Sequence, residues 1–278
     1  MKMGSGVISG GQFRPVLAVM LATCCAAAVS AQFPGPPPEP PRSARAAAPV
    51  DLTGTWVSVV TEDWEWRMVT PKKGDAESVP LNQEGRRVTD QWDPSKDGMC
   101  EAYGVAGIMR MPGRLRITWQ DDYTLKVETD AGQQTRLLRF ANPKAAATKP
   151  SATRAVPPAQ RSLQGESVAE WTGGGAGNID PFTGRGDGPG AQRWGGLKVR
   201  TTNMRPAWLR RNGVPYSEET VVTEYFTRFT HPQAGDWFVV TTTVEDPTYL
   251  TGPFITSSNF KKEPDASKFK PVPCRERK

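Results

Sequence analysis

The sequence is poor in histidine and cysteine, and it lacks the short motifs that mark common catalytic and cofactor sites. His231 is the only histidine among 278 residues, and there are four cysteines. No nucleophile elbow, glycine-rich phosphate-binding loop or metal-ligand cluster occurs in the chain. We therefore expect neither a bound metal nor an organic cofactor.

The sequence also lacks an apolar run long enough for a transmembrane helix. Val16–Val29 is apolar but too short to span a bilayer, and it follows the positive charges of Lys2 and Arg14. Small residues lead up to Ala31, as before a signal-peptidase site. This pattern predicts a secretory signal peptide over residues 1–31 and a periplasmic or secreted mature chain. Lipoprotein processing at Cys24 is the alternative.

Removal of the signal peptide leaves two cysteines, Cys100 and Cys274. Two cysteines in an exported protein favour one disulfide, which would fasten the C-terminal end of the chain to the body of the fold. In the chain-entropy model, a loop of this length contributes about 4–5 kcal/mol. A two-cysteine metal site is the alternative, but it would lack histidine partners.

The charge balance gives no indication of a nucleic-acid partner. The net charge of +6 falls to +4 when Lys2 and Arg14 leave with the signal peptide. The remaining basic residues are interspersed with acidic ones, which is typical of the solvated faces of strands and loops. We expect no nucleic-acid binding, and no feature indicates an oligomeric state.

Composition divides the mature chain into a leader and one domain. Residues 32–50 are rich in proline and alanine, and we expect a disordered or polyproline II leader, with order beginning at Asp51. Residues 51–278 are predicted to form a single domain. Two segments of low apolar content, 141–160 and 173–190, are expected to be disordered insertions.

The domain carries the pattern of antiparallel β-strands. Runs rich in valine, threonine and aromatic residues are separated by clusters of glycine, proline and aspartate. The predicted strands are Leu52–Val60, Leu115–Trp119, Thr124–Thr129, Gln134–Phe140, Leu163–Trp171, Leu197–Asn203, Val221–Phe229 and Trp237–Asp246. About ten short strands without regularly alternating helices favour one antiparallel barrel.

Three further local patterns accompany the strands. Asn82 is a candidate N-cap for a helix over Gln83–Trp92. Pro206 favours a helix over Ala207–Arg211, whose Trp208 would lie across the barrel end as a lid or plug the core. Trp64 and Trp66 are two residues apart, so they would share one face of a continuing strand.

Acidic residues on and beside the strands are the candidate catalytic groups. Glu224 alternates with apolar neighbours, and Arg228 lies on the same face. If that face points inward, we expect Glu224 and Arg228 to form a buried pair; if it points outward, both are solvated. Glu245 and Asp63 are the possible second carboxylates, because two carboxylates in different environments can divide acid and base roles.

Tryptophan is the other abundant signal, with nine in the chain. Its large apolar area and single donor suit both a barrel core and the wall of a ligand pocket. The candidate ligand-binding residues are Trp56, Trp119, Trp208, Glu224, Arg228 and Trp237.

Gly54-Thr55-Trp56 on the first strand resembles the Gly-x-Trp signature of lipocalin-type (calycin) barrels, in which the tryptophan closes one barrel end. A cysteine near the C-terminus that bridges back to the barrel, as predicted for Cys274, is also lipocalin-like. The resemblance implies a ligand-binding barrel.

The chain also resembles a group of uncharacterised exported bacterial proteins. The matching segments are Thr201–Pro206, Val222–Phe226, Val244–Pro247 and Phe260–Pro264. This likeness implies export and a β-rich fold, and it implies no activity.

The sequence thus leads to three functional hypotheses. The first is an exported lipocalin-like module that binds a small apolar or amphipathic molecule. The second is a cofactor-independent lyase, isomerase or hydrolase on the same barrel, acting through paired carboxylates. The third is a structural or interaction protein of the cell envelope.

Overall fold

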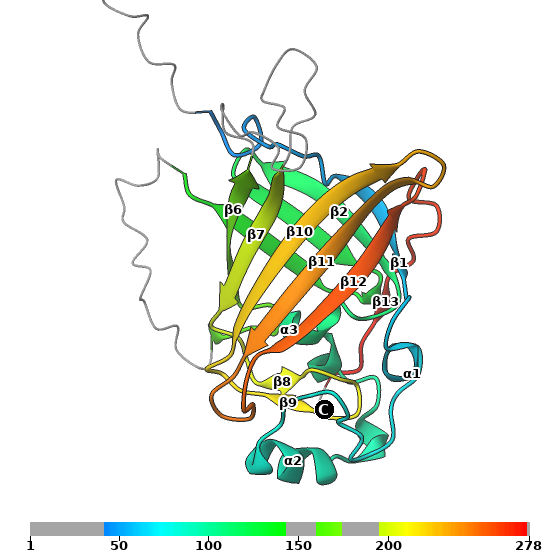
Figure 1. Ribbon diagram of the computed structural model, residues 1–278, viewed down its shortest axis with the longest axis vertical. Helices are drawn as coiled ribbons and strands as arrows, with labels where there is room; N and C mark the ends of the chain where they lie inside the picture. Colours follow the sequence, from blue (N-terminus) through cyan, green and yellow to red (C-terminus); the bar gives the residue numbers. More distant parts are fainter. Residues whose placement is uncertain (1–41, 143–159, 174–194, 277–278) are drawn as a thin grey trace, which may run out of the picture. The chain divides into compact units, whose positions relative to one another are not determined.

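A closed barrel of nine strands forms the body of the protein, which confirms the predicted all-β class (Figure 1). The computed structural model describes residues 42–142, 160–173 and 195–276, and every structural statement below concerns these ranges. The predicted signal peptide and most of the leader and of the two insertions lie outside the described residues. Around the barrel the strand order is β1-β12-β11-β10-β7-β6-β5-β3-β2.

Along each barrel strand, successive side chains point alternately into the barrel and to the outside. The barrel strands are β1 (Gly54–Val59), β2 (Arg114–Asp121), β3 (Thr124–Thr129), β5 (Thr135–Phe140), β6 (Glu166–Gly173), β7 (Gly195–Thr202), β10 (Val221–His231), β11 (Gly235–Glu245) and β12 (Phe254–Lys262). β1 closes the barrel, because Trp56 pairs with Lys262 of β12 and with Leu115 of β2. The barrel is antiparallel except at one seam, where β5 and β6 run parallel.

The barrel interior contains a layer of aromatic side chains. Trp56 is fully buried and meets Phe238 edge to face, with ring centroids 4.7 Å apart. Phe238 stacks on Phe260 at 4.8 Å and lies 6.0 Å from Phe226. The Trp56 indole N–H donates to the Leu52 carbonyl at 2.9 Å, so its one polar atom is satisfied. The first-strand tryptophan is therefore a core residue.

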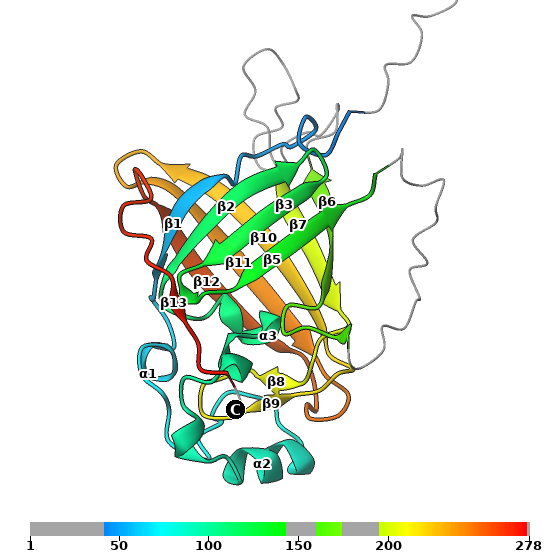
Figure 2. The ribbon, with the colours of Figure 1, turned by 180° about the vertical axis from the view of Figure 1, so that it is seen from behind.

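Short helices and a hairpin gather at one end of the barrel (Figures 1 and 2). They are α1 (Trp64–Arg67), α2 (Gln83–Asp90), η1 (Pro94–Lys96), η2 (Cys100–Tyr103), α3 (Val105–Ile108), β8 (Ala207–Trp208) and β9 (Pro215–Tyr216). We call η2, α3 and the β8–β9 hairpin the plug. Ile108 and Met109 at the end of α3 belong to the barrel core, whereas Val105 and Tyr216 pack in a second core beneath it.

The local sequence pattern predicted α2 correctly, but it predicted the wrong structure for Ala207–Arg211. The Asn82 side chain accepts the Gly85 N–H at 2.9 Å, which confirms the N-cap. The predicted helix Ala207–Arg211 is instead part of a hairpin, in which Leu209 N donates to Val214 O at 2.7 Å and Gly213 takes a φ of +81°. Burial of its apolar residues in the plug outweighs the helix-start signal of Pro206.

The first strand does not continue through Trp64 and Trp66, so the shared strand face considered for them does not form. Asp63 adopts a left-handed conformation, φ 55°, which breaks the extended backbone before α1. Trp64 is exposed, and Trp66 is covered by the Arg210 guanidinium, whose central carbon lies 4.8 Å from its ring centroid.

Order begins earlier than Asp51, because part of the leader packs on the opposite end of the barrel from the plug (Figure 1). Ala44 is buried, and its carbonyl accepts the Trp171 indole N–H at 2.7 Å. Arg45 N donates to Asp122 O at 3.0 Å. The proline- and alanine-rich composition gave no sign of these hydrogen bonds, since the partner residues lie on β6 and at the β2–β3 turn.

The predicted disulfide between Cys100 and Cys274 is present, with the two Cα atoms 5.0 Å apart and a sequence separation of 174. The disulfide holds the segment after β12, residues 263–276, which we call the C-terminal arm. This arm runs along the outside of the barrel to η2 (Figure 2). On the way, β13 (Val272–Pro273) pairs parallel with β4 (Ala131–Gly132). The described residues contain no helix that is long and apolar enough to cross a membrane.

We predict that the Cys100→Ser/Cys274→Ser double variant loses about 3–5 kcal/mol of unfolding free energy, because the unfolded chain regains the entropy of an open loop. Chemical denaturation of the oxidised wild type and the variant measures the difference. A loss below about 1 kcal/mol would show that the arm is held by its strand pairing alone.

Candidate binding cleft and buried ion pair

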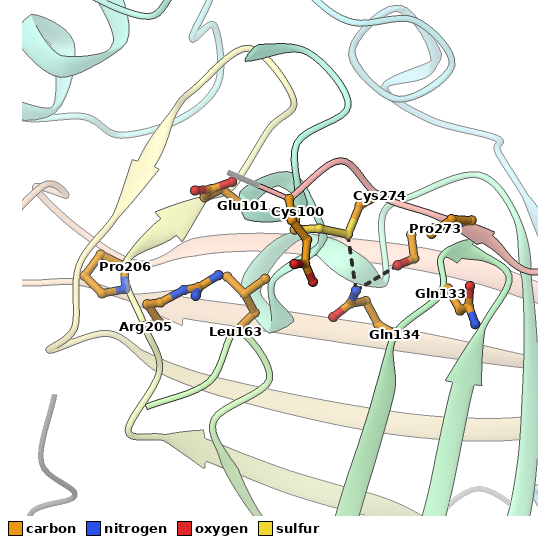
Figure 3. A pocket seen from close by; sticks show the side chains of 11 residues that line it. Cys100, Glu101, Gln133, Gln134, Leu163, Arg205, Pro206, Pro273 and Cys274 are labelled. Atoms are coloured by element: carbon orange, nitrogen blue, oxygen red, sulfur yellow. Dashed lines mark hydrogen bonds between the residues drawn. A yellow bond between two sulfur atoms is a disulfide. The ribbon is translucent and has the colours of Figure 1, made fainter. Parts of the chain in front are cut away.

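A cleft of about 780 Å³ lies beside the disulfide, outside the barrel (Figure 3). Its volume is within the range of small-molecule sites in proteins. Its lining is Cys100, Glu101, Gly132, Gln133, Gln134, Leu163, Arg205, Pro206, Pro273, Cys274 and Glu276. The lining thus combines apolar surface with two amides, one guanidinium and two carboxylates.

Five separate stretches of the chain build the cleft, one of which contributes only Leu163, before β6. η2 supplies Cys100 and Glu101, the residues after β4 supply Gln133 and Gln134, and the C-terminal arm supplies the wall around Cys274. Arg205 follows β7 and is exposed. The disulfide joins two of these five stretches directly, so the shape of the cleft depends on it.

Gln134 is fixed by its neighbours. Its amide nitrogen donates to Gly132 O at 2.7 Å and contacts Cys274 Sγ at 3.5 Å (Figure 3). Its amide oxygen accepts from the Gln164 amide at 3.1 Å, and that same Gln164 amide donates to Tyr103 O at 2.7 Å. This chain of amides makes a preformed polar wall, which lowers the cost of ordering the site when a ligand binds.

The groups near the cleft suit binding better than covalent chemistry. Tyr216, whose phenol interacts electrostatically with Arg205, is fully buried, and burial raises the pKa of its hydroxyl well above the ordinary value. It therefore stays protonated. The cysteines of the cleft are joined in the disulfide and offer no thiolate.

Glu224 points into the barrel and is fully buried, but its partner is Arg136 of β5. The two groups form a bidentate pair, with Arg136 Nη1 3.1 Å from Glu224 Oε1 and Nη2 bonded to Oε2. The predicted partner is wrong: Arg228 lies nearer the barrel end and pairs with Asp236 at 2.8 Å. Both Glu224 oxygens are thus occupied within the fold.

The other two candidate carboxylates do not join Glu224. Glu245 is exposed at the end of β11, on the outer face of the sheet, whereas Glu224 lies on the inner face. Asp63 lies before α1 and accepts from Arg110 Nη2 at 2.9 Å. The structure therefore does not form the pair of Glu224 and Glu245 that an acid–base mechanism would need.

The candidate tryptophans are dispersed over the molecule. Trp56 lies in the core. Trp119 lies at the barrel end opposite the plug, with its ring centroid 5.7 Å from that of Phe140 and 6.3 Å from that of Trp171. Trp208 of the plug meets Trp92 edge to face at 6.3 Å. Trp237, on the outer face of β11, is covered by Lys261 Nζ at 5.6 Å. None of the predicted ligand-binding residues lines the cleft.

Sequence reasoning missed the polar residues of the cleft. Glu101, Gln133, Gln134 and Arg205 belong to loops and short turns without a shared motif. The one available signal was the predicted disulfide, since the bond from Cys100 to Cys274 had to bring two of the five stretches together.

Within the described ranges, no group of three or more histidine, cysteine, aspartate and glutamate side chains is arranged to hold a metal. No protein-family model matches this sequence, and no curated protein or solved structure is significantly similar to it.

We predict that Glu224→Gln destabilises the fold by about 3–5 kcal/mol, because it leaves the buried Arg136 charge uncompensated. The double variant Glu224→Leu/Arg136→Met should recover most of that loss, since it removes both charges. Chemical denaturation of the three proteins gives the comparison.

The exposed Glu245→Gln is the matched control, and it should change the unfolding free energy by less than about 0.5 kcal/mol. Equal stability of Glu224→Gln and Glu245→Gln would contradict a buried charge pair.

Proposed function

We propose that the mature protein is an exported binding module that holds a small amphipathic molecule in the cleft beside the disulfide. The observation that carries the proposal is a preformed cleft of about 780 Å³ with both apolar and polar lining. Sites that bind small molecules typically combine such apolar area with a few fixed polar groups.

The lining suggests how the molecule would lie. Its apolar part would cover Leu163, Pro206 and Pro273, and its polar head would accept hydrogen bonds from the Arg205 guanidinium. An arginine fork suits carboxylate, sulfonate and phosphate heads. The carboxylates of Glu101 and Glu276 disfavour a ligand with several negative charges, which favours one anionic or strongly polar head.

The packing of the barrel supports a ligand outside it. The aromatic layer around Trp56 and Phe238 and the Arg136–Glu224 pair lie inside the barrel, and the plug and the leader pack at its two ends. A molecule held inside would have to displace these contacts. The amphipathic form of the ligand-binding hypothesis therefore has better support than the purely apolar form.

Export is part of the proposal and rests on two observations. The first 31 residues have the pattern of a signal peptide. The disulfide between Cys100 and Cys274 suits an oxidising compartment, where such bonds persist.

We predict that the mature chain, residues 32–278, binds an anilinonaphthalene sulfonate probe, and that Arg205→Ala weakens this binding about tenfold. The reason is the loss of a charge-assisted hydrogen bond to the sulfonate. Fluorescence titration of the oxidised protein measures both dissociation constants.

Arg200→Ala is the matched control, because Arg200 is an exposed arginine of β7 outside the cleft. Its dissociation constant should equal that of the wild type. Unchanged affinity in Arg205→Ala, or equal losses in the two variants, would place the probe elsewhere and count against the proposed function.

A further inference from the structure

Three buried arginines lie in or beside α1 at the plug end of the barrel. Arg67, Arg110 and Arg210 expose only 2%, 5% and 4% of their surface. They come from three parts of the chain: α1 itself, the residues after α3, and the loop between β8 and β9. A buried charge is costly unless it is paired, so each of the three needs a compensating group.

Two of the arginines have a carboxylate partner. Arg67 Nη1 lies 3.0 Å from Glu62 Oε1, and its Nε donates to the Arg110 carbonyl at 2.9 Å. Arg110 Nη2 lies 2.9 Å from Asp63 Oδ2. The Arg110 Nη1 group, however, is buried without a hydrogen-bond partner among the described residues.

Arg210 has no carboxylate partner in the part of the chain that the structure describes. Its Nη2 donates to Glu77 O at 2.7 Å and Ser78 Oγ at 3.1 Å, and its guanidinium covers the Trp66 ring. Its Nε and Nη1 are buried and unpartnered. Burial and the charge of Arg110 lower the pKa of Arg210 to about 10, against the opposing effect of the Asp75, Asp63 and Glu77 carboxylates, so Arg210 remains a cation at neutral pH.

Arg110 and Arg210 contact the same short stretch of chain. Arg110 binds Asp63, directly before α1, and Arg210 covers Trp66 within α1. Together they present three buried N–H-bearing nitrogens that lack an acceptor. Unpartnered N–H groups on two cations that repel each other are suitable donors for an oxyanion.

We propose that Arg110 and Arg210 form a binding site for an oxyanion: inorganic phosphate or sulfate, or the carboxylate or phosphate group of a small molecule. The anion would accept hydrogen bonds from the unpartnered nitrogens of both guanidinium groups. None of these residues lines the cleft, so this site is independent of the proposed function.

The loop before α2 would control access to the site. Glu77 and Ser78 cover Arg210, and Ser78 adopts a left-handed φ of 62° although it is not glycine. Such a conformation is costly and persists where the surrounding contacts impose it. Lys72 and Lys73 are exposed on the same loop, where they would attract an anion. We expect the loop to lift when the anion enters.

Thermal unfolding of the mature chain in phosphate, sulfate, acetate and chloride at one ionic strength tests the proposal. Phosphate or sulfate should raise the midpoint saturably, by about 5 °C at a hundredfold excess over Kd, whereas chloride should not. A response to acetate as well would indicate a carboxylate-type ligand, and a response restricted to phosphate would indicate a phosphate group.

Arg210→Met should abolish the shift, because it removes the unpaired guanidinium but keeps a long side chain. Arg87→Gln is the control; Arg87 is an exposed arginine on α2 paired with Glu84, and its variant should keep the full response. Calorimetric titration of phosphate and of sulfate into the wild-type protein adds a readout that needs no variant. Absence of saturable binding there, equal midpoints in all salts, or a full shift in Arg210→Met would each overturn the site.

Discussion

The ion pair between Arg136 and Glu224 lies inside the barrel, and both residues are fully buried. Charges in such a place are costly to desolvate, and their mutual attraction compensates only in good geometry. The bidentate contact supplies that geometry. The pair also constrains the register, because a shift of β10 by one residue would turn Glu224 to the outer face and leave Arg136 alone.

Further polar and apolar groups lie inside the barrel together with this pair. Ser167 and Thr201 share a hydrogen bond of 2.8 Å on the inner faces of β6 and β7, next to the strands that carry the pair. The aromatic layer with Trp56 and Phe238 also lies inside the barrel. Arg136 Nε is buried without a hydrogen-bond partner among the described residues, and further buried nitrogens of this kind, on Arg110 and Arg210, lie at the plug end.

The plug end therefore carries both proposed sites. The cleft depends on the disulfide arm, and the oxyanion site depends on α1 and on the loop that covers Arg210. Each site joins stretches that are distant in the sequence, on elements of only a few residues. Loops and short elements held by a rigid barrel are common positions for binding residues.

Sequence reasoning predicted the strands well where alternation is strong. On β10, the alternation of Val222, Glu224 and Phe226 with exposed residues showed which side chains share a face. It gave no way to find Arg136, which is 88 residues away and joins Glu224 only through barrel closure. The disulfide was predictable because, once the predicted signal peptide is set aside, two cysteines remain and can pair in only one way.

The sequence-based predictions were wrong where a local pattern fits two different structures, or where the contacting residue is distant in the sequence. Pro206 and Gly213 suit a helix with its end as well as a hairpin, and burial of Val214 and Tyr216 in the plug decides for the hairpin. Ala44 belongs to a stretch with the composition of a disordered leader, yet it packs against Trp171. The cleft was not predictable, because no two of its five stretches share a motif.

The most direct test of the account is to locate a bound amphipathic molecule. We would determine the crystal structure of the oxidised mature chain with a bromine-labelled medium-chain carboxylic acid and measure the anomalous signal of the bromine. The account predicts a bromine peak in the cleft, with the carboxylate at Arg205 and the barrel interior unchanged. A peak inside the barrel, between Trp56 and the Arg136–Glu224 pair, would contradict it.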